Sequence, residues 1–410
     1  MTNMDEGRSK VIFVNRYFHP DFSATSQLLS DLAFHLADGS RHVHVITSRQ
    51  GYDDASASWP AAENINGVHV TRVWTSSFGR NRLWGRTLDY LTFYGTAFIA
   101  LLRKAERDDL IVAKTDPPLI SVVASLVAAI RGARLINWIQ DLFPEVALAL
   151  RIGKPGYVAT LLRAWRNRAL HMAVKNVVLG TSMEERLMLE GLQPSKLKVI
   201  HNWADGRTLY PVPPNDNDLR RRWNLLGKVI VGYSGNLGRA HDFRTILAVA
   251  ERLADLERLV FLFIGEGAQL SWMKQHVRNK ALGNVIFKPY QPRDVLPLSL
   301  SVPDIHLISL QPALEGLIVP SKFYGITAVG RPILYIGSPT GEIPELIRKA
   351  GCGFVAKPGE VEQAAATVRG LCHDEKERQR LGAQARRLFD QYFDRPRALQ
   401  AWETVLNEAA

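Results

Sequence analysis

Short apolar runs alternate with amphipathic helical patterns along almost the whole chain, and this alternation constrains the fold more than any other feature. A helix must cross one face of a sheet before the next parallel strand begins, so the alternation predicts doubly wound parallel sheets. One series of strand-containing segments covers residues 10–15, 42–48, 68–74, 110–114, 134–141 and 176–181. A second series covers residues 228–238, 259–267, 284–290, 305–310, 332–337 and 353–357.

A segment rich in Pro, Asn, Asp and Gly separates the two series at residues 202–218, and these residue types are typical of loops. A chain of 410 residues is also longer than a single hydrophobic core usually supports. We therefore predict two doubly wound Rossmann-like α/β domains, at residues 1–205 and 206–391, that face each other across a cleft. The helix at about residues 392–410 is expected to pack back on the first domain.

The composition restricts the possible partners and the compartment. A net charge of +11 favours anionic partners, but zinc-finger spacings, ribonucleoprotein motifs and basic tails are missing, so nucleic acid is disfavoured. Only two cysteines occur, which fits a reducing cytoplasm better than a disulfide scaffold. The polar start and the lack of an apolar run of about 18 residues indicate neither a signal peptide nor a membrane-spanning helix.

Glycine-containing loops follow the first strands of the second series. Gly235 lets the backbone turn closely around a ligand, and the helix that follows can present free N–H groups to an anion. Arg239 and His241 can add charge-assisted contacts there. Gly265 ends the next strand, and the ring of Tyr290 can stack on a base. The alternatives are a plain strand-to-helix turn and a packed loop tyrosine. The loop lacks the Gly-x-Gly-x-x-Gly spacing, which disfavours hydride transfer.

The stretch PALEGLIVPSKFYGITAVGRP, residues 312–332, places an acidic residue, a lysine and a helix start close together. A helix that begins near residues 320–321 would direct its N–H groups, the Ser321 hydroxyl and the Lys322 ammonium at a diphosphate. The carboxylate of Glu315 would then hydrogen-bond sugar hydroxyls. The alternative is that Lys322 is a solvated helix residue and Glu315 an ordinary loop charge.

The first series carries polar loops at the same ends of its strands. Small side chains between the first strand and its helix would let an acceptor approach closely, and two later loops carry aspartates that can hold or deprotonate an acceptor hydroxyl. Aspartate after a strand is also a common helix cap, which is the alternative. The residues concerned are Ser23, Ala24, Thr25, Lys114, Asp116 and Asp141. No pair of residues has the spacing of a zinc site, so we predict no metal.

Eight of these stretches, in order, resemble family-4 glycosyltransferases of the two-Rossmann "B" architecture. More narrowly, the chain resembles the fucosamine-transferase-like enzymes of bacterial O-antigen, capsule and exopolysaccharide assembly. The matching stretches are YFHPDFSATSQLLSDLA, KTDPPL, NWIQDLFPEVA, VIHNWAD, GYSGNLGRAH, FLFIGEG, PYQPR and EGLIVPSKFYGITAVGRP.

The resemblance implies retaining transfer of a sugar, of hexose or N-acetylhexosamine type, from a nucleotide-sugar and without a metal cofactor. The donor would be a UDP-sugar in the second domain, and the acceptor would enter along the first. Asp141 and Glu315 would be the catalytic carboxylates. The donor-binding residues would be Gly235, Asn236, Arg239, His241, Gly265, Tyr290, Glu315, Ser321 and Lys322, and the acceptor-binding residues Ser23, Ala24, Thr25, Lys114 and Asp116.

The sequence departs from the wider family at three positions. Asn236 and His241 stand where many members have arginine and lysine, and Gly325 stands where many have a second glutamate. The phosphate contacts would therefore depend on Arg239 and Lys322. A nucleotide-sugar epimerase or phosphorylase of similar shape, or a non-catalytic protein that binds sugar nucleotides, stays open as an alternative.

Arginine and aromatic residues are mixed in residues 78–98 and 151–175, both in the expected acceptor domain. Basic and aromatic side chains together suit a lipid headgroup boundary. We therefore expect the protein to be cytoplasmic and to dock on the anionic inner face of the plasma membrane, where it would take a polyprenyl-diphosphate-linked acceptor. The alternative is that these helices pack on the sheet and their arginines only solvate the outer face.

Overall fold

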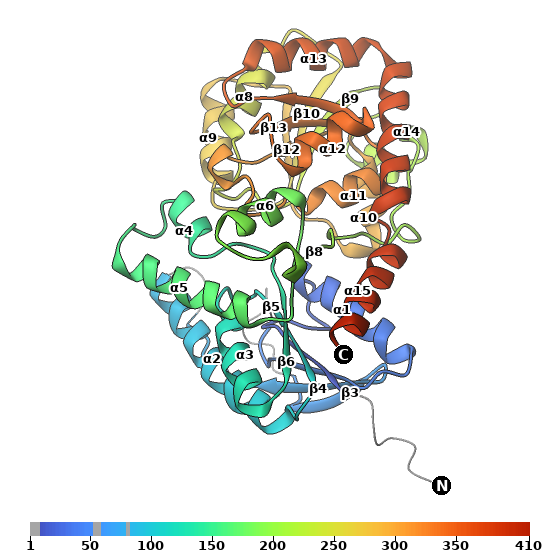
Figure 1. The fold of residues 1–410 in the computed structure, drawn as a ribbon. Helices are drawn as coiled ribbons and strands as arrows, with labels where there is room; N and C mark the ends of the chain where they lie inside the picture. The colour runs from blue at the N-terminus through green and yellow to red at the C-terminus, as the bar shows by residue number, and fades with distance from the viewer. Residues whose placement is uncertain (1–8, 52–58, 79–82) are drawn as a thin grey trace. The chain divides into compact units, whose positions relative to one another are not determined.

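The computed structural model describes residues 9–51, 59–78 and 83–410. The chain forms two compact units (Figure 1), one of residues 1–201 with Ala398–Ala410 and one of Asn202–Arg397. The sequence placed the boundary after residue 205 and the returning helix from about residue 392.

The first unit is built on an eight-stranded sheet with the order β3-β4-β2-β1-β5-β6-β7-β8. All neighbouring strands are parallel except β3 and β4, which form an antiparallel pair at one edge. The strands are β1 Val11–Val14, β2 Val43–Ser48, β3 Ala62–Ile65, β4 Val68–Val73, β5 Leu110–Lys114, β6 Arg134–Trp138, β7 Lys175–Val178 and β8 Leu197–Val199.

Helices cover both faces of this sheet, with α2, α3 and α5 on one side and α1 with α15 on the other (Figure 1). Alternate residues of each strand point to opposite faces, so Ile12 and Val14 pack with Phe93 of α2 and Ala124 of α3. The helices are α1 Ala24–Asp38, α2 Leu83–Lys104, α3 Ile120–Arg131, α4 Glu145–Ala149, α5 Tyr157–Met172, α6 Thr181–Leu189, the 3-10 helix η1 Pro194–Lys196 and α15 Arg395–Ala409.

The second unit has a six-stranded, wholly parallel sheet with the order β11-β10-β9-β12-β13-β14. Its strands are β9 Val229–Ser234, β10 Leu259–Ile264, β11 Val285–Lys288, β12 Ile305–Ser309, β13 Ile333–Ile336 and β14 Gly353–Ala356. Its α-helices are α7 Asp218–Arg222, α8 Phe243–Arg252, α9 Leu270–Asn279, α10 Leu296–Ser301, α11 Lys322–Ala328, α12 Glu342–Ala350, α13 Val361–His373 and α14 Glu375–Tyr392. Three 3-10 helices, η2 Pro214–Asp216, η3 Arg293–Val295 and η4 Pro312–Leu314, lie in its loops.

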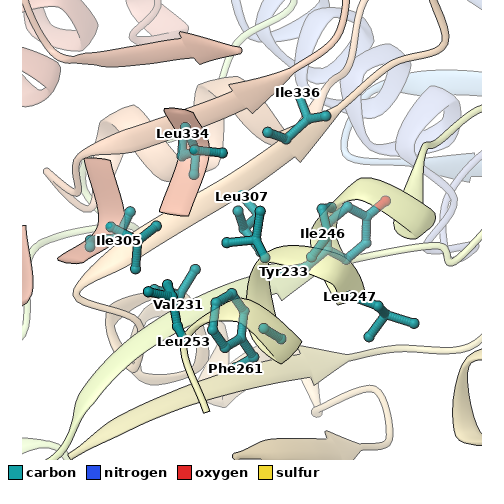
Figure 2. Packing of buried hydrophobic residues seen from close by; sticks show 14 of the residues in the cluster. Val231, Tyr233, Ile246, Leu247, Leu253, Phe261, Ile305, Leu307, Leu334 and Ile336 are labelled. Carbon is teal, nitrogen blue, oxygen red and sulfur yellow. The ribbon is translucent and has the colours of Figure 1, made fainter. Parts of the chain in front are cut away.

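Both faces of the second sheet carry buried apolar residues. Figure 2 shows one face, where Val231 and Phe261 of the sheet pack with Ile246 and Leu253 from the α8 side. On the other face, Ile230 and Leu262 belong to a separate cluster. A sheet that is buried on both faces needs near-continuous apolar strands, which explains runs such as LVFLFI in β10.

The prediction of two doubly wound α/β domains is confirmed, and the strand order of each sheet reverses beside its first strand. In such sheets ligands bind beyond the carboxyl ends of the strands, where the order reverses. That point lies between β9 and β12 in the second unit and between β1 and β5 in the first. The sequence reading missed two short strands, β3 and β8.

Candidate functional site

Two glycine loops approach each other beyond the carboxyl ends of β9 and β10. Gly235 and Gly265 have φ values of 131° and 139°, in the region that favours glycine. A Cβ atom at Gly265 would overlap the carbonyl oxygen of Gly235 and would lie 3.3 Å from the ring of Tyr290. The predicted residues Gly235, Gly265 and Tyr290 therefore lie together, and Tyr290 is 51% exposed at this edge.

A lysine–tyrosine pair lies beside these glycines. The half-buried Lys322, the first residue of α11, places its ammonium 3.6 Å from the ring centroid of Tyr233 and donates to the Tyr233 hydroxyl. A Cβ atom at Gly235 would lie 3.7 Å from the Lys322 nitrogen, so the ammonium reaches the first glycine loop. Burial lowers the pKa of Lys322 well below its usual value and raises that of Tyr233. A cation that has lost hydration in this way gains strongly from an anionic ligand.

Hydrogen bonds from β12 and its loop hold the first glycine loop in place. The Nδ1 atom of His241 lies 2.5 Å from the carbonyl oxygen of Ser309, and Gln311 donates to the carbonyl oxygen of Arg239 at 2.7 Å. Burial, and less strongly the charge of Lys322, lower the pKa of His241 to about 3. The ring of His241 thus has a structural role in holding this loop, and its contact with an anionic ligand stays a prediction.

The carboxylate of Glu315 caps the start of α12. It accepts hydrogen bonds from the backbone N–H of Glu342 at 3.2 Å and from the hydroxyl of Tyr335 at 3.1 Å. A Cβ atom at Gly341 would overlap this carboxylate, so the glycine is what lets it reach the helix end. Burial raises the pKa of Glu315, and the hydrogen bonds oppose that rise. Glu315 is therefore more than an ordinary loop charge. It has a structural role as the cap of α12, and contact with a sugar would be an additional role.

Three further predicted donor residues lie at the surface of the same loops. The side chains of Asn236, Arg239 and Ser321 are exposed. Ser321 precedes α11 without capping it through its hydroxyl. Their positions allow contact with a ligand, and the fold does not need their side chains for the packing described above.

In the first unit, two of the predicted acceptor residues contact each other where β1 and β5 end. The hydroxyl of Thr25 donates to the carboxylate of Asp116 at 2.7 Å. Ser23 is nearly buried and caps α1 by accepting a hydrogen bond from the N–H of Ser26, whereas Ala24 is exposed as the first residue of that helix. Thr25 and Asp116 thus form a polar pair, and Ser23 has a structural role.

Lys114 does not lie where an acceptor can reach it. As the last residue of β5 it is fully buried, with its ammonium 3.4 Å from the ring centroid of Trp138 and without a hydrogen-bond partner among the described residues. Burial lowers its pKa well below the usual value. The prediction of direct acceptor contact by Lys114 is therefore wrong for this conformation, because the strand carries the side chain inward.

Asp141 follows β6 and exposes its side chain. An exposed carboxylate at this strand end can accept a hydrogen bond from a hydroxyl group.

Sequence reasoning missed Tyr233, Gln311 and Tyr335. Each acts through a contact with another segment, 89 positions away for Tyr233 and Lys322 and 20 for Tyr335 and Glu315. Their positions at or just after strand ends were visible, but the direction of each side chain was not. Among the described residues, no group of three or more His, Cys, Asp or Glu side chains is suited to a metal ion, and no helix is long and apolar enough to cross a membrane.

Family models match both units of the chain. Residues 25–203 match the glycosyl transferase 4-like domain, and residues 215–388 match the glycosyl transferases group 1. The chain is 28% identical over 294 residues to the probable glycosyltransferase WbjE of Pseudomonas aeruginosa, covering 72% of this chain and 73% of that protein. It is 25% identical over 376 residues to the putative colanic acid biosynthesis glycosyl transferase WcaI of Escherichia coli K12, covering 88% and 91%.

The fold has a solved counterpart in Anabaena Alr3699/HepE, crystallised in complex with UDP. The TM-score is 0.72 at 17% identity, over 97% of this chain and 100% of that chain. The two matched domains, the two relatives and the paired Rossmann-like units agree with one another. The chain therefore belongs to the glycosyltransferases that join a 4-like N-terminal domain to a group 1 C-terminal domain in the two-Rossmann B fold.

Proposed function

We propose that this protein is a retaining, metal-independent glycosyltransferase of bacterial surface polysaccharide synthesis. It would move a sugar from a UDP-sugar to a lipid-linked saccharide at the inner face of the plasma membrane. The observation that carries the proposal is the desolvated ammonium of Lys322 beside the Gly235 and Gly265 loops. The names of WbjE and WcaI, and the UDP complex of Anabaena HepE, support the same reading.

The donor end of the proposal follows from the geometry of the second unit. Gly235 and Gly265 present main chain without side chains at this edge, where we expect the diphosphate to approach, and the Lys322 nitrogen lies 3.7 Å from the position of a Cβ atom at Gly235. The exposed ring of Tyr290 can stack on the base. As the bond to the sugar breaks, negative charge builds up on the leaving diphosphate. A preorganised cation in a poorly hydrated site stabilises that charge strongly.

The acceptor end follows from Asp141 and the Thr25–Asp116 pair of the first unit. These groups can hold the attacking hydroxyl in place. In a retaining transfer without a covalent intermediate, the leaving phosphate oxygen takes the hydroxyl proton on the face from which it departs. The protein then contributes mainly by positioning the two substrates and stabilising the diphosphate.

The proposed docking on a membrane would use the outward face of α2, α3 and α5, which lie side by side in the first unit (Figure 1). We call it the apolar-basic face. Its exposed apolar side chains are Trp84, Leu88, Leu91 and Ile99 on α2, Leu126 and Ile130 on α3, and Tyr157, Val158 and Trp165 on α5. Its exposed cations are Arg103, Lys104, Arg131, Lys154, Arg163 and Arg168.

One arginine expected on this face is not on it. Arg166 is buried and forms ion pairs with Glu145 at 3.0 Å and with Glu190 at 2.6 Å. Arg163 also reaches Glu145, at 2.8 Å, but stays partly exposed. The remaining cations and the aromatic rings still match an anionic lipid surface, whose headgroups attract basic residues and whose interface accepts Trp and Tyr.

Nucleotide binding tests the donor site. Lys322→Gln removes a charge-assisted contact to the diphosphate and should weaken UDP binding by about ten- to a hundredfold in calorimetry. Lys349→Gln is the matched control, because Lys349 is an exposed lysine of the same unit. Equal UDP affinity in both variants would contradict the donor site.

Chelation with EDTA should leave sugar transfer unchanged.

Vesicle sedimentation tests the membrane face. The wild-type protein should bind phosphatidylglycerol vesicles at low salt, and the Trp84→Ser/Trp165→Ser variant should bind them weakly. Tyr392→Ser is the control, since Tyr392 is 53% exposed and lies in the second unit. The absence of wild-type binding at low salt would exclude docking on an anionic membrane.

A further inference from the structure

Arg16 is a buried arginine at the point where the strand order of the first sheet reverses. It follows β1, its side chain is 6% exposed, and its guanidinium lies 5.4 Å from the ring centroid of Tyr17 and 5.3 Å from that of Tyr90. Its Nε atom has no hydrogen-bond partner among the described residues. A buried guanidinium usually satisfies its donors, so this one has capacity left for an anion.

Among the described residues, the carboxylate that lies at salt-bridge distance from Arg16 is already engaged. Asp89 lies 3.7 Å from Arg16, but its other oxygen accepts from the hydroxyl of Ser76 at 2.7 Å and from the N–H of Phe78 at 3.0 Å. The long ion pair and the two short hydrogen bonds indicate that Asp89 mainly fixes the loop before α2. The charge of Asp89 therefore neutralises the charge of Arg16 only in part.

A second arginine lies on the same tyrosine ring. Arg86 of α2 places its guanidinium 5.2 Å from the ring centroid of Tyr90 and donates from Nε to the Tyr90 hydroxyl at 2.7 Å. Arg86 is exposed, whereas Arg16 is buried. Tyr90 thus joins one buried and one exposed guanidinium, and the planar fork of arginine suits phosphate oxygens.

The main chain links Arg16 to the predicted acceptor residues. The backbone N–H of Arg16 donates to the carbonyl oxygen of Asp116 at 2.7 Å, and the carboxylate of Asp116 accepts from the hydroxyl of Thr25. Trp84, Leu88 and Leu91 are exposed on α2, but the helix turn places them on the opposite side of α2 from Arg86 and Tyr90. Arg16 therefore lies beside groups that suit sugar hydroxyls, and the apolar residues of α2 belong to another side of the helix.

We infer that Arg16, Tyr90 and Arg86 form the binding site for the diphosphate of a polyprenyl-diphosphate-linked acceptor. This inference rests on the proposed function and adds residues that the family resemblance did not supply. Arg86 contacts the phosphate from the solvent side, and Arg16 holds Tyr90 and adds its charge from beneath. The acceptor sugar then lies toward Asp116 and Asp141.

Farnesyl diphosphate, a soluble short-chain lipid diphosphate, tests this site on the full-length protein in the presence of UDP, which occupies the other diphosphate site. Wild-type protein should bind it far more tightly than farnesol. Arg86→Gln should weaken that binding about ten- to a hundredfold and Arg86→Lys by less, because lysine keeps the charge but loses the fork. Arg103→Gln, which removes an exposed charge from the same helix, should have little effect.

Two control measurements separate this site from the proposed function. Lys322→Gln should weaken UDP binding and keep farnesyl diphosphate binding, whereas Arg86→Gln should weaken farnesyl diphosphate binding and keep UDP binding. The affinity for phosphatidylglycerol vesicles should fall by the same small amount in Arg86→Gln and Arg103→Gln, because each variant removes one exposed positive charge. Equal farnesyl diphosphate affinity in these two variants, or wild-type affinity no greater for farnesyl diphosphate than for farnesol, would overturn the inference even if UDP binding is intact.

Discussion

At the scale of single residues, Gly265 shows how closely the donor loop is built. Its φ of 139° is costly for any residue with a side chain, and a Cβ atom there would overlap the carbonyl oxygen of Gly235. The main chain of one loop therefore rests directly on the main chain of the next.

Gly265→Ala should lower the free energy of unfolding by more than about 1 kcal/mol and weaken UDP binding, because the two loops must separate. Gly283→Ala is a suitable control, since a Cβ atom there meets no other atom within 4 Å. Urea unfolding and a UDP titration measure the two effects. A Gly265→Ala variant as stable as Gly283→Ala, with unchanged UDP affinity, would contradict this account of the loops.

At the scale of elements, α12 is held at its first turn by a residue from another loop. Gly341 precedes the helix and has no side chain to cap it, so the carboxylate of Glu315 takes this role by accepting from the N–H of Glu342. An anion at the N-terminus also interacts favourably with the helix dipole. The loop that carries Glu315 leads on to Lys322, so this cap ties α12 to the donor site.

Glu315→Ala should therefore reduce stability as well as sugar transfer. Loss of the cap, and of the partner of the buried Tyr335 hydroxyl, should cost about 1–2 kcal/mol in urea unfolding. Glu345→Ala removes another acid from the first turn of α12 and should cost less than about 0.5 kcal/mol, because its ion pair with Lys349 is at the surface. Equal unfolding midpoints for the two variants would show that Glu315 does not support the helix.

The elements also show what the sequence could and could not predict. All six strands of the second unit were predictable, because each is an apolar run between polar loops. The edge strand β3 was missed because it has only four residues, which alternate between exposed and half-buried positions and include no apolar run. The turn at Asn66 and Gly67, both with positive φ, carries the pattern typical of a tight hairpin and could have revealed it.

The candidate site was predictable in part for a related reason. Glycines after strands and a lysine near a helix start can be recognised from the sequence alone, and Gly235, Gly265 and Lys322 do lie together. The inward direction of Lys114, the structural role of His241 and the capping role of Glu315 depend on contacts between distant segments. Neither periodicity nor spacing contains that information.

At the scale of the whole molecule, the chain leaves the first unit after His201 and returns to it at Ala398. The returning part of α15 is anchored in the first unit by Trp402, which is fully buried with its ring centroid 4.6 Å from that of Trp138. At its end, the guanidinium of Arg134 donates to the carbonyl oxygen of Ala409 at 2.9 Å. The first unit is therefore complete only when the last residues of the chain are in place.

Trp402→Ala should destabilise the first unit by about 3–5 kcal/mol, the usual cost of removing a large buried aromatic side chain. Native-state hydrogen exchange can locate the effect, because the amides of β6 belong to the first unit and those of β12 to the second. Amides of β6 should exchange faster in the variant, while those of β12 stay protected. Gln400→Ala, at an exposed position of the same helix, should leave both sets unchanged. If β6 keeps its protection in Trp402→Ala, α15 does not stabilise the first unit, and a chain that ends before Ala398 should fold as well as the full-length protein.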